Sequence, residues 1–314
     1  MAFWEYLNPY FLLISLRNFL YDRELLRVER LPLKVISVGN LSCGGTGKTT
    51  LTRFLAENLS KKYKLGILLR GYKRSSRGYR EVLSQGELKA SLDEAGDEAY
   101  LLSLVFRGNS RVSVGVCEDR VYGGGVMAQK LGLELLLLDD GFQHRKIYRD
   151  LDLVLLKKQD LSDKLLPWGR LREPLSSLKR AQVLVLTYQE VYPFDFALED
   201  KAVFKMYRTR WRLLNWELKE EPLRKELSFI CFSGLGFNSQ FIEVVKKLGL
   251  KVKEFYALPD HYNYRNFKLK EEESYLTTLK DFVKLTPRKN LYVLDFEVEV
   301  PGLLDYLNQA LKDY

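Results

Sequence analysis

Short apolar runs, separated by stretches of helical periodicity, recur through the first two thirds of the chain. They are bounded by polar loops and occupy residues 33–38, 65–69, 112–116, 135–138, 151–156 and 183–186. Residues 49–59 follow the first run and place Phe54, Leu55 and Leu59 at helical spacing. Continuous apolar strands that alternate with helices are typical of a mostly parallel sheet with helices on both faces. The pattern therefore predicts an α/β fold for this part of the chain.

A second, shorter α/β pattern occupies the C-terminal third. Strands are expected at residues 229–232, 251–256, 276–277 and 291–294, and a helix at 237–248. Between the two patterns, residues 196–225 break the rhythm with a strand-like alternation and a cluster of charges. We therefore predict an α/β domain at residues 31–195, a linker at 196–225 and a smaller α/β domain at 226–314.

The first 30 residues predict a separate amphipathic helix. Asn8-Pro9 is a typical helix start, because asparagine caps free N–H groups and proline suits the first turn. The uncharged run 6–16 is too short to span a membrane, which takes about 20 apolar residues. Aromatic residues and arginines such as Arg17 and Arg23 suit a lipid headgroup layer. Periodicity alone does not decide between a helix packed on the core and a helix lying in a membrane surface.

The composition narrows the class of protein. The 314 residues carry a formal net charge of +9, which favours an anionic partner: nucleic acid, a phosphorylated substrate or a membrane surface. A hydrophobic content of 46% excludes a disordered or collagen-like chain. Two histidines and three widely spaced cysteines form neither a zinc pattern nor a disulfide framework. They indicate a reducing compartment and exclude a His/Cys-rich metal site.

The strongest motif lies between the first apolar run and the helix after it, where residues 39–50 read GNLSCGGTGKTT. Glycines let backbone N–H groups converge on phosphate oxygens, and a helix start adds further donors. Lys48 can reach the β- and γ-phosphates of a nucleotide, and the Thr49 hydroxyl can bind Mg²⁺. Ser42 departs from the strict P-loop pattern, which has glycine there, but the strand–loop–helix context supports a phosphate site. The residues expected to hold the nucleotide are Gly44, Gly45, Thr46, Gly47, Lys48, Thr49 and Thr50.

Two acids follow a buried strand of the same predicted sheet. Asp139 and Asp140 come directly after the run 135–138. An acid at such a strand end can hold Mg²⁺ directly or through water. No Asn-Lys-x-Asp guanine motif occurs, which favours ATP. The loop and the acids together predict a site for a nucleoside triphosphate and Mg²⁺.

Further polar segments follow strand ends, which is where open α/β sheets bind their ligands. They are RGYKR at 70–74, GDE at 96–98, QHR at 143–145, PWGRLREP at 167–174 and PDHY at 259–262. Each alone is typical of a solvated loop. Together they predict a cationic cleft with spare carboxylates, which suits transfer of a phosphoryl group to an anionic acceptor.

In this order, the segments resemble the tetraacyldisaccharide 4′-kinase family of lipid A biosynthesis. The matching strings are GNLSCGGTGKTT, RGYKR, GDEAYLL, DDGFQHRKIYRDLD, LPWGRLREP, LPDHYNY and TTLKDFVKL. The resemblance implies a P-loop NTPase-like kinase that uses ATP and Mg²⁺ to phosphorylate the 4′-hydroxyl of a lipid A disaccharide 1-phosphate. It implies a peripheral position on the anionic cytoplasmic face of a bacterial inner membrane, and it favours the membrane interpretation of the N-terminal helix. It implies neither nucleic acid nor a protein partner.

The resemblance also assigns roles to residues. Asp97 would be the base that activates the acceptor, with His261 near it and Lys48 on the transferred phosphate. Thr49, Asp139 and Asp140 would hold the metal. The residues expected to bind the acceptor are Arg70, Tyr72, Gln143, His144, Arg170, Arg172 and Glu173.

Three features depart from the family pattern, all outside this centre. Residues 161–164 read LSDK where glycine and asparagine are usual, and Leu279 replaces a glutamate in a Thr-Glu-Lys-Asp string. Residues 123–125 are three glycines that interrupt a stretch expected to be helical.

Two other functions compete with the kinase. A membrane-associated regulatory ATPase with a deviant P-loop would carry lysine at position 43, which is Cys43 here. A nucleic-acid-binding module would gather its basic residues and carry a recognised motif, whereas here they are dispersed and no such motif is found.

Overall fold

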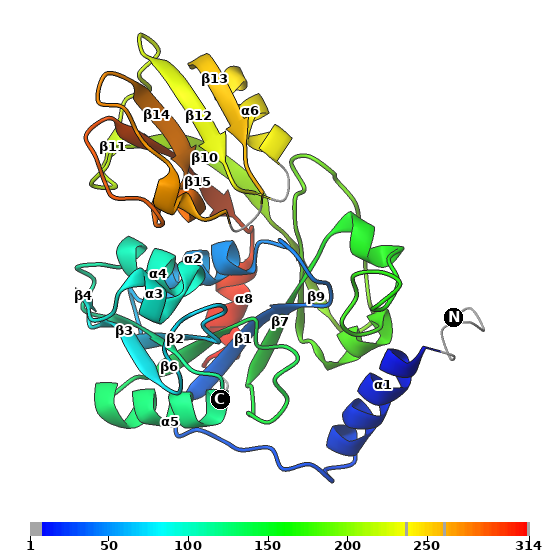
Figure 1. The fold of residues 1–314 in the computed structure, drawn as a ribbon. Helices are drawn as coiled ribbons and strands as arrows, with labels where there is room; N and C mark the ends of the chain where they lie inside the picture. Colours follow the sequence, from blue (N-terminus) through cyan, green and yellow to red (C-terminus); the bar gives the residue numbers. More distant parts are fainter. Residues whose placement is uncertain (1–7, 236–237, 260–261, 313–314) are drawn as a thin grey trace. The chain divides into compact units, whose positions relative to one another are not determined.

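The computed structural model describes residues 8–235, 238–259 and 262–312. The chain divides into two units, each with its own sheet. Unit 1 comprises Met1–Arg208 and Val298–Tyr314, and unit 2 comprises Thr209–Glu297 (Figure 1). Of the helices in the described part, none is long and apolar enough to cross a membrane.

The sheet of unit 1 has nine strands and is mostly parallel. The spatial order is β4 (Glu87–Leu88), β3 (Arg80–Ser84), β5 (Val112–Val116), β2 (Leu65–Leu69), β6 (Leu135–Asp139), β1 (Lys34–Asn40), β7 (Leu151–Leu156), β8 (Val183–Leu186) and β9 (Ala202–Lys205). In this order the strands from β5 to β9 run parallel, and β3 runs antiparallel to both of its neighbours, β4 and β5.

Helices cover both faces of this sheet. Alternate residues of its strands point to opposite faces, and they pack into different hydrophobic clusters. Ile36 and Val38 of β1 pack with α2 (Lys48–Leu59), α4 (Asp97–Val105) and α8 (Leu303–Ala310), whereas Val35 packs with α5 (Arg120–Leu131). The same alternation runs through β2 and β6. The helices of unit 1 are α1 (Pro9–Asp22), α2 (Lys48–Leu59), α3 (Leu92–Ala95), α4 (Asp97–Val105), α5 (Arg120–Leu131), α8 (Leu303–Ala310) and the 3₁₀ helices η2 (Lys158–Leu161) and η3 (Leu175–Arg180). The predicted α/β class with helices on both faces is confirmed.

α5 corrects one expectation, since the helix continues through the three glycines. A Cβ at Gly123 would lie 2.6 Å from Cys117 Cβ, and one at Gly124 would lie 2.5 Å from Leu31 Cδ1. Glycine therefore lets α5 approach the sheet and the preceding segment closely, and this packing offsets the poor helix propensity.

The sheet of unit 2 has six strands, with parallel pairing among β12, β13, β14 and β15. Its spatial order is β11 (Glu220–Glu221), β10 (Tyr207–Leu214), β15 (Leu291–Glu299), β14 (Ser274–Thr278), β12 (Ser228–Ser233) and β13 (Lys251–Ala257). Its helices are α6 (Asn238–Lys247), α7 (Leu279–Phe282) and the 3₁₀ helix η4 (Tyr264–Asn266). The core of unit 2 includes Phe229, Val245 and Leu276.

The unit boundaries differ from the predicted domains. Residues 196–225 are not a linker, because they contain β9 of the first sheet and both β10 and β11 of the second. The strand-like alternation at 203–211 belongs to two strands in different sheets, a division that local periodicity does not reveal.

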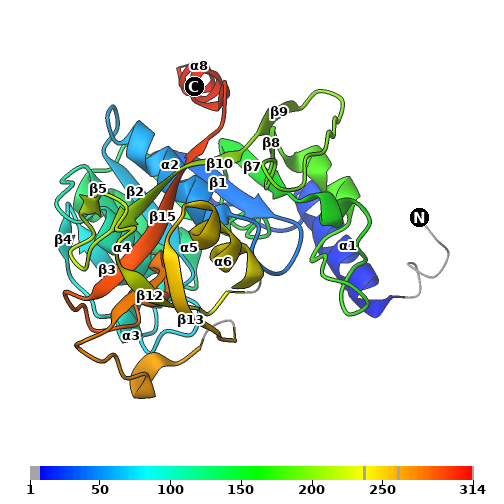
Figure 2. The same cartoon turned by 90° about the horizontal axis from the view of Figure 1, so that it is seen from above.

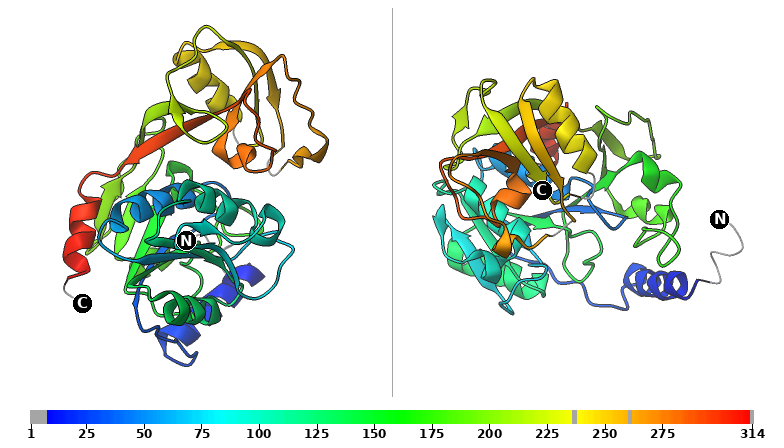
Figure 3. Two further views of the ribbon diagram at one scale, coloured as in Figure 1. Left: turned by 90° about the vertical axis from the view of Figure 1, so that its left-hand side faces the viewer. Right: turned by 45° about the horizontal axis from the view of Figure 1, so that its top comes forward.

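The C-terminal segment also returns to unit 1, as the red helix beside the sheet in Figures 2 and 3 shows. Leu303, Leu307 and Leu311 are buried in the same cluster as α2 and β1. Unit 2 is therefore an insertion between β9 and α8 rather than a C-terminal domain.

We expect Leu307→Ala to lower the free energy of unfolding of unit 1 by about 2–5 kcal/mol, because Leu307 is fully buried and its loss leaves a cavity. Urea denaturation followed by circular dichroism measures the change. Gln309→Ala, an exposed position on the same helix, is the matched control and should stay within about 0.5 kcal/mol of wild type. Equal stability of the two variants would contradict the packing of α8 on unit 1.

Candidate functional site

The phosphate loop connects β1 to α2 at the carboxyl end of the parallel strands. β1 lies between β6 and β7, and the loop enters α2 through Gly47, whose φ of 88° is left-handed. Glycine adopts this conformation at little cost. A Cβ at Gly47 would also come within 3.0 Å of Met206 Cε. α2 begins at Lys48, so its first free N–H groups lie beside the loop, as an anion site requires.

The loop leaves its glycines open and buries one hydroxyl. Gly44 and Gly45 are exposed, whereas Thr46 is buried and its Oγ1 has no hydrogen-bond partner among the described residues. A buried hydroxyl without a partner is a group that a phosphate oxygen can satisfy. Thr49 and Thr50 lie half-buried in the first turn of α2.

Asp139 ends β6 and faces the first turns of α2. Its buried carboxylate accepts hydrogen bonds from Thr49 Oγ1 at 3.3 Å and Thr52 Oγ1 at 3.2 Å. Burial raises the pKa of Asp139 to about 7, and the charge of Glu98 acts in the same direction. A cation beside this carboxylate would offset the cost of burying its charge.

Asp140 is the next residue, and its surroundings are cationic. Arg172 donates to the two carboxylate oxygens at 3.0 and 2.7 Å, and Lys48 Nζ lies 3.7 Å from one of them. Burial alone would raise the pKa of Asp140, but Lys48 and Arg172 outweigh it and lower the pKa to about 2. The structure thus brings together the predicted residues Lys48, Asp140 and Arg172.

Asn40, which the sequence did not single out, holds this group together. It ends β1, is fully buried, and accepts a hydrogen bond from Lys48 Nζ at 3.0 Å through its Oδ1. Arg172 also donates to Asn40, and Gln143 Nε2 donates to its backbone oxygen at 2.9 Å. Asparagine is common in turns, so its presence after an apolar run carries no specific signal.

The Gly-Asp-Glu segment contacts the loop after β2. Gly96 has a φ of 80°, and a Cβ there would lie 2.9 Å from the backbone oxygen of Tyr72. Asp97 begins α4 and is half-buried, and the charge of its neighbour Glu98 acts on Asp139. The start of α4 therefore lies close to the acids, with Tyr72 exposed beside it.

Arg120 is a second residue that the sequence did not reveal. Its buried guanidinium donates to the backbone oxygen of Asp139 at 3.2 Å. Burial lowers the pKa of Arg120, while Asp140 and Asp139 oppose that shift, and the charge of Arg70 acts in the same direction as burial. Nothing in the local sequence marks this arginine, because only the fold brings the start of α5 to the end of β6.

Two predicted acceptor residues have other contacts. Glu173 is 0% exposed, and it accepts hydrogen bonds from Asn18 at 3.1 Å and Arg180 at 2.6 Å. Glu173 therefore stabilises the loop from its buried side, and its carboxylate does not face solvent. Arg170 is exposed and pairs with Asp163 at 3.0 Å.

Of the two histidines, His144 lies in the described part of the chain. Burial lowers the pKa of His144 to about 4, with Arg120 adding to the shift, and His144 Nε2 has no partner in the described part of the chain. His261 lies outside the described residues.

The residues present fit a magnesium ion shared with a nucleotide. Within the described ranges, no three His, Cys, Asp or Glu side chains gather to hold a metal by themselves. Mg²⁺ usually takes one or two protein oxygens together with phosphates and water. The Thr49 hydroxyl and the buried Asp139 carboxylate, adjacent to the loop, are such oxygens.

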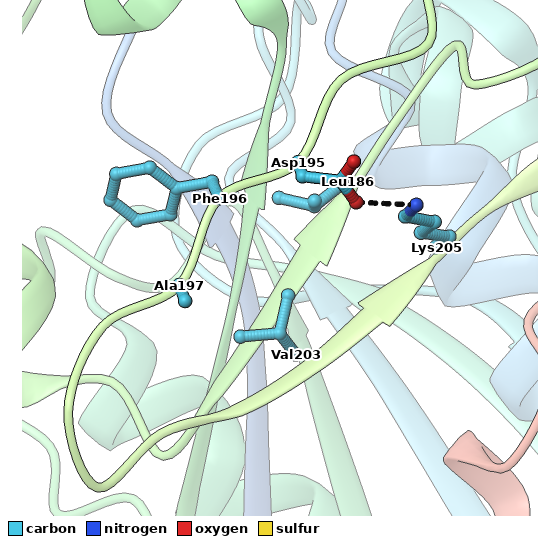
Figure 4. Close-up of a pocket in the computed structure, with 6 residues that line it drawn as sticks. All are labelled: Leu186, Asp195, Phe196, Ala197, Val203 and Lys205. Carbon is cyan, nitrogen blue, oxygen red and sulfur yellow. Dashed lines mark ion pairs between the residues drawn. The ribbon is translucent and has the colours of Figure 1, made fainter.

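A separate hollow of about 480 Å³ lies beside β8 and β9 in unit 1 (Figure 4). Its lining is mostly apolar, with an ion pair between Asp195 and Lys205 at 2.6 Å. None of the residues predicted for the site lines it; the lining residues are Leu186, Asp195, Phe196, Ala197, Val203 and Lys205.

A strand–loop–helix turn with a lysine, a helix-start threonine and an acid on the adjacent strand is typical of P-loop enzymes that bind nucleoside triphosphates. The sequence profile of one family of this class, "Tetraacyldisaccharide-1-P 4′-kinase" (LpxK), matches residues 6–312. The chain belongs to this family, and the predicted activity, an ATP-dependent 4′-kinase of the lipid A precursor, is confirmed.

Similar proteins support this assignment over nearly the whole chain. The tetraacyldisaccharide 4′-kinase of Aquifex aeolicus is 51% identical over 92% of this chain and 90% of its own length. That of Koribacter versatilis is 36% identical over 87% of this chain and 85% of its own. A crystal structure of LpxK from Aquifex aeolicus in complex with ATP has a TM-score of 0.90 and 49% identity, and the match covers 99% of this chain and 96% of that one.

The half-buried imidazole of His144 predicts a pH effect on stability. Its folded pKa of about 4 lies below the ordinary value of 6.5, so the unfolded chain binds a proton first as the pH falls. The contribution of His144 to the free energy of unfolding should therefore decrease between pH 6.5 and 4 by about 1–2 kcal/mol, allowing for partial solvent access, while the raised pKa of Asp139 acts in the opposite direction. Urea denaturation of wild type and His144→Gln at pH 7 and pH 4.5 measures this contribution as the difference between the two proteins. His144→Gln keeps the backbone bonds and should lose this contribution; an unchanged pH dependence would contradict the assignment.

Proposed function

We propose that this chain transfers the γ-phosphate of ATP to the 4′-hydroxyl of a tetraacyldisaccharide 1-phosphate at an anionic membrane surface. The observation that carries the proposal is the cluster of Lys48, Asp140 and Arg172 around Asn40, directly beside the phosphate loop. Transfer of a phosphoryl group depends on positioning and on neutralising charge, and this cluster supplies both.

The nucleotide phosphates bind at the loop between Gly44 and Thr50. Backbone N–H groups of the loop and of the first turn of α2 donate to phosphate oxygens, and the partnerless hydroxyl of Thr46 adds one donor. Lys48 moves from Asn40 and Asp140 onto the transferred phosphate, since a lysine side chain is flexible and both present partners lie at its tip.

Thr49 and Asp139 would hold Mg²⁺ directly, and Asp140 would contact the ion through a water molecule. When bound, the ion neutralises negative charge on the β- and γ-phosphates. The raised pKa of Asp139 and its contact with the Thr49 hydroxyl support this role.

Asp97 accepts the proton of the acceptor hydroxyl. As the 4′-oxygen forms a bond to the γ-phosphorus, the bond from that phosphorus to the β-phosphate oxygen breaks, ADP leaves and the proton goes to the carboxylate. The place of Asp97 at the start of α4, beside Tyr72 and near Asp139, supports this role. The role of His261 as its neighbour rests on the family resemblance.

α1 supplies the membrane contact. Its outer face is apolar, with Leu13 71% and Leu16 58% exposed, and Leu12 and Phe19 also exposed. Such a face on a 14-residue helix suits insertion into the interface of a bilayer rather than across it. The acyl chains of the lipid then remain in the membrane while the sugar reaches the site, at the cytoplasmic face of a bacterial inner membrane.

The direct test incubates purified protein with ATP, MgCl₂ and a lipid A disaccharide 1-phosphate in detergent. Mass spectrometry should show the lipid gaining one phosphate. Release of inorganic phosphate from ATP with no change in the lipid would favour the regulatory ATPase instead.

We expect Asp97→Asn to lower turnover by about 10²–10⁴-fold, because the variant cannot take the proton, while ATP affinity stays near wild type. Turnover is measured by transfer of labelled phosphate to the lipid, and affinity by equilibrium binding. Asp93→Asn, an exposed acid on α3, is the matched control. Wild-type turnover in the Asp97 variant would remove it as the base.

We expect the double variant Leu13→Ser/Leu16→Ser to bind anionic phospholipid vesicles at least about tenfold more weakly, because it loses exposed apolar area. Co-sedimentation with vesicles measures this. Tyr122→Ser, an exposed position on α5, is the control and should bind as wild type does. Undiminished binding of the double variant would exclude α1 as the anchor.

A further inference from the structure

The inner face of α1 combines buried polar groups with Tyr10 and Phe11, which pack against an apolar cluster of unit 1, in contrast to its exposed outer face. Asn8 and Asn18 are buried, and Asn8 also caps the helix, accepting from the N–H of Tyr10. Their partners lie more than a hundred residues away in the sequence: Asn8 Nδ2 donates to the backbone oxygen of Leu166 at 2.8 Å. Figure 2 shows α1 lying against the segment that follows β7.

These contacts reach the loops that carry site residues. Tyr10 Oη donates to the backbone oxygen of Arg172 at 2.8 Å, and Arg17 donates to the backbone oxygen of Gln143. The side chains of those same two residues converge on Asn40 and Asp140. A single residue, Arg172, therefore spans from α1 to the phosphate loop.

A buried ionic group fixes the register of α1 beside Arg172. The next residue, Glu173, is fully buried between Asn18 and Arg180. On the other side, Arg145 donates to the backbone oxygen of Asn18 at 3.0 Å and pairs with Asp22 at 2.6 Å. A polar interface of this type specifies one geometry, because any shift of the helix leaves buried groups without partners.

We propose that α1 is a positioning element of the transfer site: Tyr10 and Asn18 hold the Arg172 loop so that its guanidinium stays on Asp140 and beside Lys48. The proposal rests on the phosphate-transfer function of that site and adds to it. It separates two tasks on one helix, with the outer face contacting lipid and the inner face setting the position of Arg172.

Kinase assays in detergent micelles, where vesicle binding is not needed, test the inner face. Tyr10→Phe removes only the hydroxyl that holds Arg172, and we expect kcat to fall about three- to tenfold with KM for the lipid within twofold of wild type. Asn18→Leu should lower kcat further. Both should bind anionic vesicles as wild type does and melt within a few degrees of it.

Tyr21→Phe is the matched control. Tyr21 lies on the same helix, its ring stacks with Arg17 and Arg145, and its hydroxyl makes no hydrogen bond in the described part of the chain. This variant should keep wild-type kcat.

Wild-type kcat in both Tyr10→Phe and Asn18→Leu would overturn the proposal. An equal loss of kcat in Tyr21→Phe would also overturn the proposal, since the loss would then reflect a nonspecific disturbance of the packing of α1. Lys48→Ala separates a failure of the proposed phosphate site from a failure of the proposed role of α1. Full turnover of Lys48→Ala would refute the phosphate site itself. An inactive Lys48→Ala together with wild-type kcat in the Tyr10 and Asn18 variants would refute only the role of α1.

Discussion

The pairing of Asp140 with Lys48 and Arg172 is the interaction on which the site depends. The three charges come from the residue after β6, from α2 and from a distant loop, and Asn40 gives both cations a second acceptor. The adjacent Asp139 faces hydroxyls instead of cations, so two consecutive carboxylates have pKa values shifted in opposite directions. Asp140 lies just beyond β6 with a left-handed φ of 53°, so its side chain takes a different direction from that of the strand residue Asp139. The charges at the site are thus held in place by the protein's own side chains.

The N-terminal helix shows why two interpretations of one segment need not exclude each other. Its apolar residues suit both a core helix and a membrane surface, and hydrophobic periodicity alone did not decide between them. In the structure, Asn8 and Asn18 are buried against loops of unit 1, while Leu13 and Leu16 face outward. Polar residues, which hydrophobic periodicity ignores, decide which face turns inward.

The parallel strands and the phosphate loop were predictable because their signals are local. A run such as 135–138 is apolar throughout since both faces of the strand are covered, and Gly47-Lys48-Thr49 follows a strand directly. Asn40 and Arg120 were not predictable, because their roles arise from contacts between segments far apart in the chain. The return of α8 to unit 1 and the placement of β9 and β10 in different sheets were not predictable for the same reason. Glu173 was expected at the acceptor from its motif, and only its burial shows that it braces the loop.

The insertion of unit 2 has a consequence for how the chain folds during synthesis. Val300, Leu303 and Leu307 belong to the core that covers β1 and α2, yet they follow all of unit 2 in the sequence. The sheet with the phosphate loop therefore leaves the ribosome with part of one face uncovered, until unit 2 has been made. Contacts between segments this distant slow folding, because the loop that joins them must close first. Early folding of unit 2 would shorten that loop, since its entry strand β10 and exit strand β15 are neighbours in one sheet.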